Sequence, residues 1–195
     1  VWLAERLVSE GYIVLALDHP GTSTWDRDPA EAAKLWERPR DIGRLLDTFL
    51  ASELATAVDT SRIFAIGHSL GGYSVLAAAG ARFDVRRLGT FCSANPSAIA
   101  CTVFAQLGVG DDPTHEASLA ADLSDPRLSG VIALDPGGVP AIVPQSLKAT
   151  KTPIAVISAG RTPDFLNPAH EAEALATMAD IEHVSFADAG HFDFL

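Results

Sequence analysis

Residues 67–71, Gly-His-Ser-Leu-Gly, are of the types from which a protein can build a nucleophilic serine. The apolar run Ile63–Ile66 precedes them and an alanine-rich segment follows, which predicts a strand, a sharp turn and a helix. At such a turn the side chain of Ser69 would project from the carboxyl edge of a sheet in a strained conformation. Because the helix would begin at Leu70, its backbone N–H is the predicted donor to an oxyanion formed on Ser69.

The glycines around this serine support the same interpretation. A β-carbon at Gly67 or Gly71 is expected to collide where strand and helix approach each other, and Gly72 would allow a still closer approach. A bare G-x-S-x-G pattern occurs by chance in roughly a few per cent of chains of this size. The predicted strand before it and helix after it are the context that makes Ser69 a candidate nucleophile.

A serine nucleophile needs a base, and six histidines are available. His191 follows the last predicted strand, and Gly190 would let the loop bring its ring over the sheet edge. The alternative is a loop histidine that packs on Phe192. We expect His68 to point away from the serine and His19 to lie in a turn beside the site. His191 is therefore the predicted base.

Two aspartates could orient that base. Asp135 ends the apolar run 131–134 and precedes Pro-Gly-Gly, whereas Asp164 lies in a Pro-containing loop after the next predicted strand. Both keep the chain order nucleophile, acid, histidine. We favour Asp135 and keep Asp164 as the alternative acid. The aspartate that is not used would be a turn or helix-cap residue.

The rest of the chain predicts the elements that must position these residues. Helical and strand patterns alternate, which indicates an α/β fold with a doubly wound, mostly parallel sheet covered by helices on both faces. In such a sheet ligands bind at the carboxyl ends of the strands. The strands are predicted at 12–17, 63–68, 130–134, 154–158 and 183–186, and the helices near 2–11, 39–54, 70–80, 140–150 and 168–178.

Two segments lack this periodicity. Residues 22–38 are polar, with isolated tryptophans at Trp25 and Trp36, and predict a surface excursion. Residues 94–127 are expected to form a lid or a pocket wall, as long irregular segments in compact domains often do. The length, and the absence of an internal repeat, predict a single domain over 1–195.

Composition excludes several classes of function. The net charge of −11 and the lack of a basic run argue against nucleic-acid binding and against electrostatic attachment to anionic membranes. No apolar run is long enough to span a bilayer. Cys92 and Cys101 would form either a single disulfide or two reduced thiols, so the sequence leaves cytoplasmic and secreted locations open.

Together these residues resemble the α/β-hydrolase superfamily, within it the branch of predicted dienelactone hydrolases and platelet-activating-factor acetylhydrolase-like esterases. The resemblance extends over nearly the whole chain and implies a Ser-His-Asp esterase. The sequence Ala-Leu-Asp ending at Asp135 looks like the acid position of the acetylhydrolase-like enzymes, after the sixth strand, whereas many other hydrolases place the acid after the seventh, as at Asp164. The resemblance rests on residues 3–7, 11–12, 18–21, 38–41, 46–47, 67–72 and 189–192.

The chain departs from this superfamily at its start. Hydrolases of this fold take a second oxyanion N–H from a loop between the third strand and the first helix, and the sequence begins after that loop. The first strands also have no counterpart, so we expect a fragment of a longer enzyme. Losing one oxyanion donor typically lowers turnover by about 10²–10³, and we expect the fragment to be poorly active alone.

The resulting hypothesis is a hydrolase of small-molecule carboxylic esters that forms an acyl-enzyme on Ser69, with His191 as base. It requires no metal and no organic cofactor. A thioesterase, lactonase or peptidase could use the same triad. From a different class, a catalytically silent binding module could keep the fold. A cofactor-dependent Rossmann enzyme is disfavoured because no G-x-G-x-x-G follows the first strand.

Overall fold

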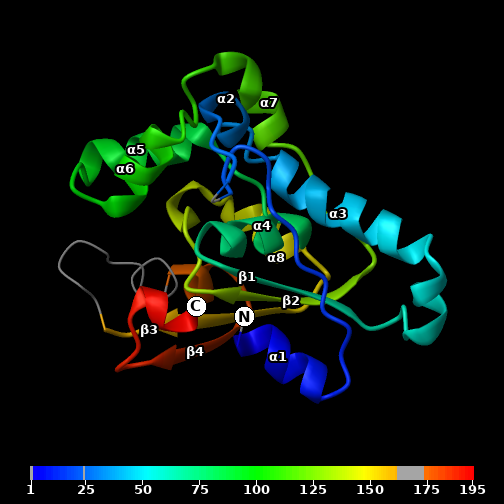
Figure 1. Cartoon of the computed structure of the whole chain (residues 1–195). Coiled ribbons are helices and arrows are strands. Elements are labelled where there is room, and N and C mark those ends of the chain that lie inside the picture. Colours follow the sequence, from blue (N-terminus) through cyan, green and yellow to red (C-terminus); the bar gives the residue numbers. More distant parts are fainter. Residues whose placement is uncertain (1, 24, 162–173) are drawn as a thin grey trace.

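A computed structural model describes residues 2–23, 25–161 and 174–195 of the chain. In this part of the chain the central element is a parallel sheet with the strand order β1-β2-β3-β4 (Figure 1). The predicted α/β class and parallel sheet are confirmed. The strands are β1 (Ile63–His68), β2 (Leu128–Leu134), β3 (Ile154–Ala159) and β4 (Glu182–Phe186).

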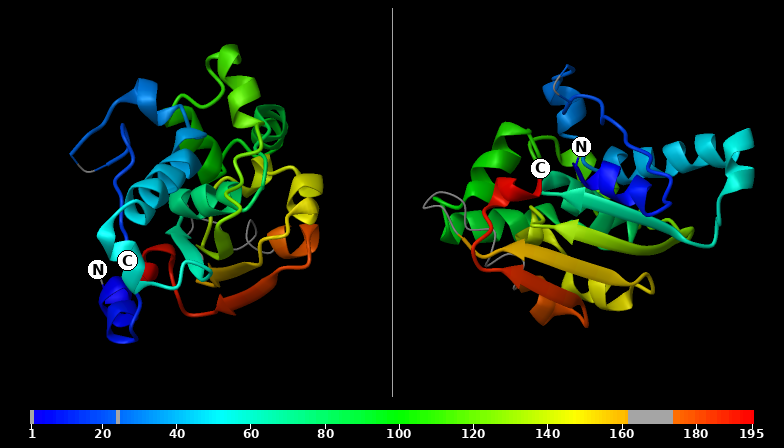
Figure 2. Two further views of the ribbon diagram at one scale, coloured as in Figure 1. Left: turned by 90° about the vertical axis from the view of Figure 1, so that its right-hand side faces the viewer. Right: turned by 60° about the horizontal axis from the view of Figure 1, so that its bottom comes forward.

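Helices lie on both sides of this sheet. Figures 1 and 2 show α3 and α4 on one side and α1 on the other. No helix in the described residues is long and apolar enough to cross a membrane. The helices are α1 (Trp2–Ser9), α2 (Pro29–Ala32), α3 (Glu37–Leu50), α4 (Leu70–Ala78), α5 (Val85–Ala94), α6 (Ile99–Gln106), α7 (Glu116–Leu119) and α8 (Pro144–Ala149), with short 3-10 turns at 53–57, 113–115, 139–141 and 191–194 and a helical stretch at 174–178.

One face of the sheet forms the main hydrophobic core. Val131 and Val156, on neighbouring strands, are almost completely buried beneath α4 and α8. The small residues of α4, such as Ala78, let this helix lie close to the strands. Leu147 of α8 and Leu175 of the 174–178 helix are fully buried in the same cluster. Alternation along each strand therefore places the apolar residues under the helices, as the sequence periodicity predicts.

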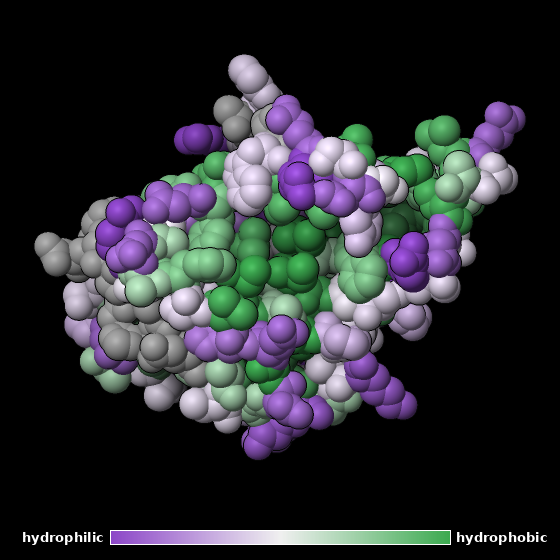
Figure 3. Space-filling model, turned by 90° about the horizontal axis from the view of Figure 1, so that it is seen from below, coloured by the Kyte–Doolittle hydropathy of each residue, from purple (hydrophilic) through white to green (hydrophobic). Residues whose placement is uncertain are grey.

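The other face of the sheet is less completely covered. Phe64, Val184 and Phe186 are about half exposed on β1 and β4. Figure 3 shows apolar side chains gathered over the side of the molecule seen from below. Among the described residues, coverage by helices is thus unequal between the two faces.

Two sequence predictions about the N-terminal part were wrong. Residues 12–17 form no strand, and Tyr12 and Ile13 are about half exposed. An apolar run becomes a strand only where another strand supplies its backbone hydrogen bonds, and in the described residues β1 is the edge of the sheet.

The second error concerns the polar segment 22–38. Trp25 is 92% exposed, as a surface excursion predicts, but Leu35 and Trp36 are buried. They pack in a second apolar cluster with Tyr73 of α4 and Phe104 of α6. The segment therefore crosses the surface only in its first half and then packs against α4 and α6, the helices after the turn at Ser69.

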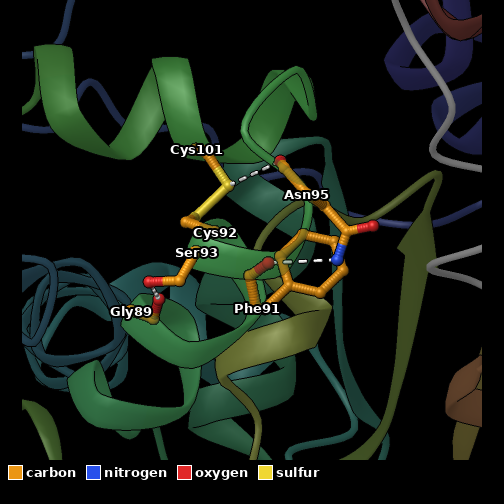
Figure 4. Close-up of a disulfide and its surroundings, with 6 residues drawn as sticks. All are labelled: Gly89, Phe91, Cys92, Ser93, Asn95 and Cys101. Carbon is orange, nitrogen blue, oxygen red and sulfur yellow. Dashed lines mark hydrogen bonds between the residues drawn. A yellow bond between two sulfur atoms is a disulfide. The ribbon is translucent and has the colours of Figure 1, made fainter.

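The predicted lid segment, 94–127, contains α6, a 3-10 turn and α7. A disulfide between Cys92 of α5 and Cys101 of α6 joins this segment to the helix before it (Figure 4). The intervening turn is also closed by Asn95, whose amide donates to the carbonyl of Phe91 at 3.0 Å. The bridge and the turn together fix α6 beside α5.

The turn from β1 into α4 depends on two close backbone approaches. A β-carbon on Gly67 would lie 2.1 Å from the carbonyl oxygen of Gly71, and one on Gly72 would lie 2.7 Å from Cα of Pro136. Gly71 faces open space, so the expectation that a β-carbon at this position would collide was wrong. The restricted positions are therefore 67 and 72.

We expect Gly67→Ala to lower the free energy of unfolding by about 1–3 kcal/mol or more, because the added methyl group must displace backbone. Gly71→Ala is the matched control, with an expected change of about 1 kcal/mol at most, in the stabilising direction because alanine favours helix. Urea titration followed by circular dichroism measures both. Equal stabilities of the two variants would contradict this account of the turn.

Removing the disulfide tests how much the Cys92–Cys101 bridge stabilises the protein by constraining the unfolded chain. For a sequence separation of 9 residues, loop-closure entropy predicts that the double variant Cys92→Ala/Cys101→Ala loses about 2.5 kcal/mol. Thermal melting with and without reductant should show the same loss in the reduced wild-type protein. A variant as stable as the oxidised protein would contradict the prediction.

Candidate active site

Ser69 lies at the corner between β1 and α4 with φ 54° and ψ −115°. A positive φ is unfavourable for a residue with a side chain, so the surrounding hydrogen bonds must hold it. The Ser69 N–H donates to the carbonyl of Leu134 at 2.9 Å, and its own carbonyl accepts from the N–H groups of Gly137 (3.0 Å) and Tyr73 (3.2 Å). The corner is therefore fixed by the neighbouring strand, the loop after it and the first turn of α4.

The helix that follows presents its first amides at this corner. Leu70 is the first residue of α4, and the first N–H groups of a helix have no partner within the helix. Their partial positive charge adds to that of the helix dipole. An anionic oxygen bound to Ser69 would find this donor and this charge nearby.

Asp135 follows β2 and is completely buried, with φ 41°. Its N–H donates to the carbonyl of Ile157 at 2.7 Å. One carboxylate oxygen accepts from the N–H of Ala159 at 3.1 Å, and the other lies 2.6 Å from Nδ1 of His191. Both oxygens therefore have donors, which is what a buried carboxylate requires.

His191 begins the 3-10 turn 191–194 and is 8% exposed. The loop before it is attached to the end of β3, because the Arg161 N–H donates to the carbonyl of Ala189 at 2.9 Å. Asp193 accepts from the Gly190 N–H (2.9 Å) and from the Arg161 guanidinium (3.0 Å). Since Nδ1 faces a carboxylate, the neutral ring carries its proton there and leaves Nε2 as an acceptor.

The structure brings several of the predicted site residues together at the carboxyl ends of the strands. His68 pairs with Leu134 in the β1–β2 register, so the residues that follow them, Ser69 and Asp135, leave neighbouring strands at the same level. His191 reaches these strand ends from the loop after β4. The alternative acid, Asp164, lies outside the described residues.

His68 makes a contact that the sequence analysis did not foresee. Its Nε2 lies 2.7 Å from the carbonyl oxygen of His191, and the centres of the two rings are 4.4 Å apart. Burial, followed by the proximity of His191, lowers the pKa of His68 below the usual value of a histidine. The sequence analysis expected His68 to point away from the serine and named no partner for it, whereas the structure places its ring against His191.

A separate cavity of about 380 Å³ lies beside the 19–22 turn. His19 Nδ1 is 2.9 Å from an Asp41 oxygen, and burial lowers the pKa of this histidine. The Arg38 guanidinium donates to Thr22 (2.7 Å) and Ser74 (2.9 Å), and burial lowers its pKa to about 10. The cavity is lined by residues between 19 and 44, and neither the candidate nucleophile nor the candidate base lines it. The hydrogen bonds of His19 and Arg38 join the 19–22 turn to α3 and α4.

Comparison with known proteins gives partial matches. A family model described as PET hydrolase-like matches residues 1–97. Cutinase est1 of Thermobifida alba is 33% identical over 88 residues, which are 44% of this chain and 27% of that protein. Cutinase 2 of Thermobifida cellulosilytica is 31% identical over 88 residues, 44% of this chain and 30% of that protein.

These alignments cover little of the relatives. The matched part spans 25–30% of the length of the curated cutinases, including the cutinase of Thermobifida fusca strain YX. The segment matched by the family model contains Ser69 and ends before Asp135 and His191. The finer dienelactone hydrolase and acetylhydrolase-like placement has no counterpart among these matches. The parallel sheet and the cutinase-type matches together support the α/β-hydrolase superfamily for this chain.

Proposed function

We propose that this protein is a carboxylic ester hydrolase whose catalytic residues are Ser69, His191 and Asp135. The observation that carries the proposal is the buried 2.6 Å contact between Nδ1 of His191 and Asp135, at the sheet edge where Ser69 occupies a strained turn. A carboxylate on Nδ1 leaves Nε2 free to accept a proton from a serine hydroxyl. The partial similarity to cutinases supports the same chemistry.

In the proposed reaction, the Ser69 oxygen attacks the ester carbonyl carbon while Nε2 of His191 takes the hydroxyl proton. Asp135 stabilises the resulting imidazolium and keeps its ring oriented. The imidazolium then donates its proton to the departing alcohol, which leaves an acyl group on Ser69. A water molecule then attacks the acyl carbon while Nε2 of His191 takes its proton, and the imidazolium returns this proton to the departing Ser69 oxygen as the carboxylic acid is released.

Stabilisation of the tetrahedral oxyanion falls to the first amide of α4 in this proposal. The Leu70 N–H lies directly after the nucleophile and at the positive end of the helix dipole. The hydrogen bonds on the Ser69 backbone hold this peptide before substrate arrives. Such preorganised donors contribute to catalysis because they need not reorient as charge develops.

For the substrate class, we propose small carboxylic esters. Two groups of esterases are candidates for the family to which the chain belongs within the superfamily. The matched relatives are named cutinases and the family model PET hydrolase-like, which favours esters of the kind found in polyesters. The placement near dienelactone hydrolases and platelet-activating-factor acetylhydrolase-like esterases is supported by a different feature. Asp135 follows β2, the strand next to the nucleophile strand, and that is the acid position of the acetylhydrolase-like enzymes.

A fluorophosphonate probe tests whether the Ser69 hydroxyl is activated. We expect the probe to label the protein at Ser69, with no labelling of Ser69→Ala or of protein unfolded before addition. Mass spectrometry of the digested protein locates the modified residue. Absence of labelling in the folded protein would instead favour a catalytically silent binding module.

Substitution of the two candidate acids distinguishes their roles. Asp135→Asn should lower kcat on p-nitrophenyl esters by about 10⁴-fold, because an amide at this position favours the wrong tautomer of the base. Asp164→Asn is the matched control, and its kcat should stay within about tenfold of the wild type. The opposite order of effects would assign the acid to Asp164.

A further inference from the structure

His68 is the last residue of β1 and directly precedes the candidate nucleophile. Its ring meets the C-terminal segment of the chain. Nε2 is 2.7 Å from the carbonyl oxygen of His191, and the ring centre lies 4.4 Å from that of His191 and 6.0 Å from that of Phe194. The residue before the serine is thus in direct contact with the proposed base.

The partner atom determines the state of this histidine. A carbonyl oxygen can only accept a hydrogen bond, so Nε2 of His68 must carry the proton and donate it. Burial and the neighbouring His191 ring lower the pKa of His68, which favours the neutral ring, and the carbonyl oxygen selects the tautomer with the proton on Nε2. A neutral ring at this distance avoids placing a second positive charge beside the imidazolium that His191 forms during the reaction.

We propose that His68 is a positioning residue for His191, an inference that rests on the proposed function of the site. Asp135 holds the His191 ring through Nδ1, and His68 holds the His191 backbone through the carbonyl oxygen. These two contacts, one from the residue after β2 and one from the last residue of β1, hold both the ring and the backbone of the proposed base.

Among the described residues, one ion pair also lies at this loop, and it is more exposed. The side chains of Arg161 and Asp193 pair at 3.0 Å, but they are 63% and 53% exposed. Solvent screens an exposed pair, so its contribution is small. The His68 contact is partly buried and lies on the base itself, and for this reason we assign the positioning role to His68.

Three variants test this role. His68→Gln places an amide N–H near the position of Nε2, His68→Asn is too short to reach it, and His68→Leu has no donor. We expect the Leu and Asn variants to lower kcat on p-nitrophenyl esters by about ten- to a hundredfold with KM within about twofold, since small misplacements of a catalytic group have effects of this size. The Gln variant should recover to within about tenfold of the wild type.

Arg161→Met is the matched control, because it removes the exposed pair beside the same loop. Its kcat should stay within about threefold of the wild type. Thermal melting of every variant identifies those that fold. If the Leu variant does not fold, the comparison of Gln with Asn decides the question, because both keep a polar amide at position 68.

A second readout does not depend on turnover. The proton between Nδ1 of His191 and Asp135 should give a far-downfield NMR resonance, retained in the Gln variant and broadened or shifted in the Leu and Asn variants. Wild-type kcat and an unchanged resonance in the Leu and Asn variants would overturn the positioning role. If the wild type neither hydrolyses esters nor reacts with the fluorophosphonate, the proposed function fails, and the resonance alone still tests whether His68 holds His191.

Discussion

The hydrogen bond between His191 and Asp135 is the contact on which the arrangement of the site depends. It joins the C-terminal loop to the end of β2 inside the protein, where the carboxylate has no access to solvent. A buried carboxylate without donors would be strongly destabilising. The Ala159 N–H and the His191 ring supply those donors, so the loop that carries the proposed base also helps to satisfy the buried Asp135 carboxylate.

Two residues with positive φ stand side by side at this edge. Ser69 follows β1 and Asp135 follows β2, and both leave their strands in conformations that residues with side chains rarely adopt. Hydrogen bonds from one turn to the other, such as that from Gly137 to the Ser69 carbonyl, hold the two turns together. Strain of this kind persists only where the surroundings determine the backbone, and it is concentrated here at the residues with candidate chemical roles.

The sequence predicted those parts of the fold that depend on local periodicity. The runs that became β1, β2, β3 and β4 were apolar and bounded by turns, and the amphipathic pattern of α3 was visible in its spacing. Residues 12–17 had an equally apolar pattern but form no strand, because strand formation depends on a pairing partner that periodicity does not specify. The burial of Leu35 and Trp36 likewise depends on α4 and α6, which are distant in the sequence.

For the site, the types of Ser69 and His191 and their places after strands were sufficient to select them as candidates. The sequence favoured Asp135 as the partner of His191 but left Asp164 as an alternative, since both satisfied the same rule of chain order. The contact of His68 with the His191 backbone was out of reach, because it requires the path of the loop after β4. Side-chain chemistry could be anticipated from residue type, whereas partners depended on the tertiary path of the chain.

The separation of these residues along the chain has a consequence for the order of folding. His191 meets Asp135 across 56 positions and His68 across 123, whereas α4 is stabilised by bonds between neighbouring turns. Closing such long loops is entropically costly and is compensated only when the distant contacts form. Helical structure should therefore return early when the denatured protein is diluted into buffer, and the contacts of His191 with Asp135 and His68 should be among the last to form.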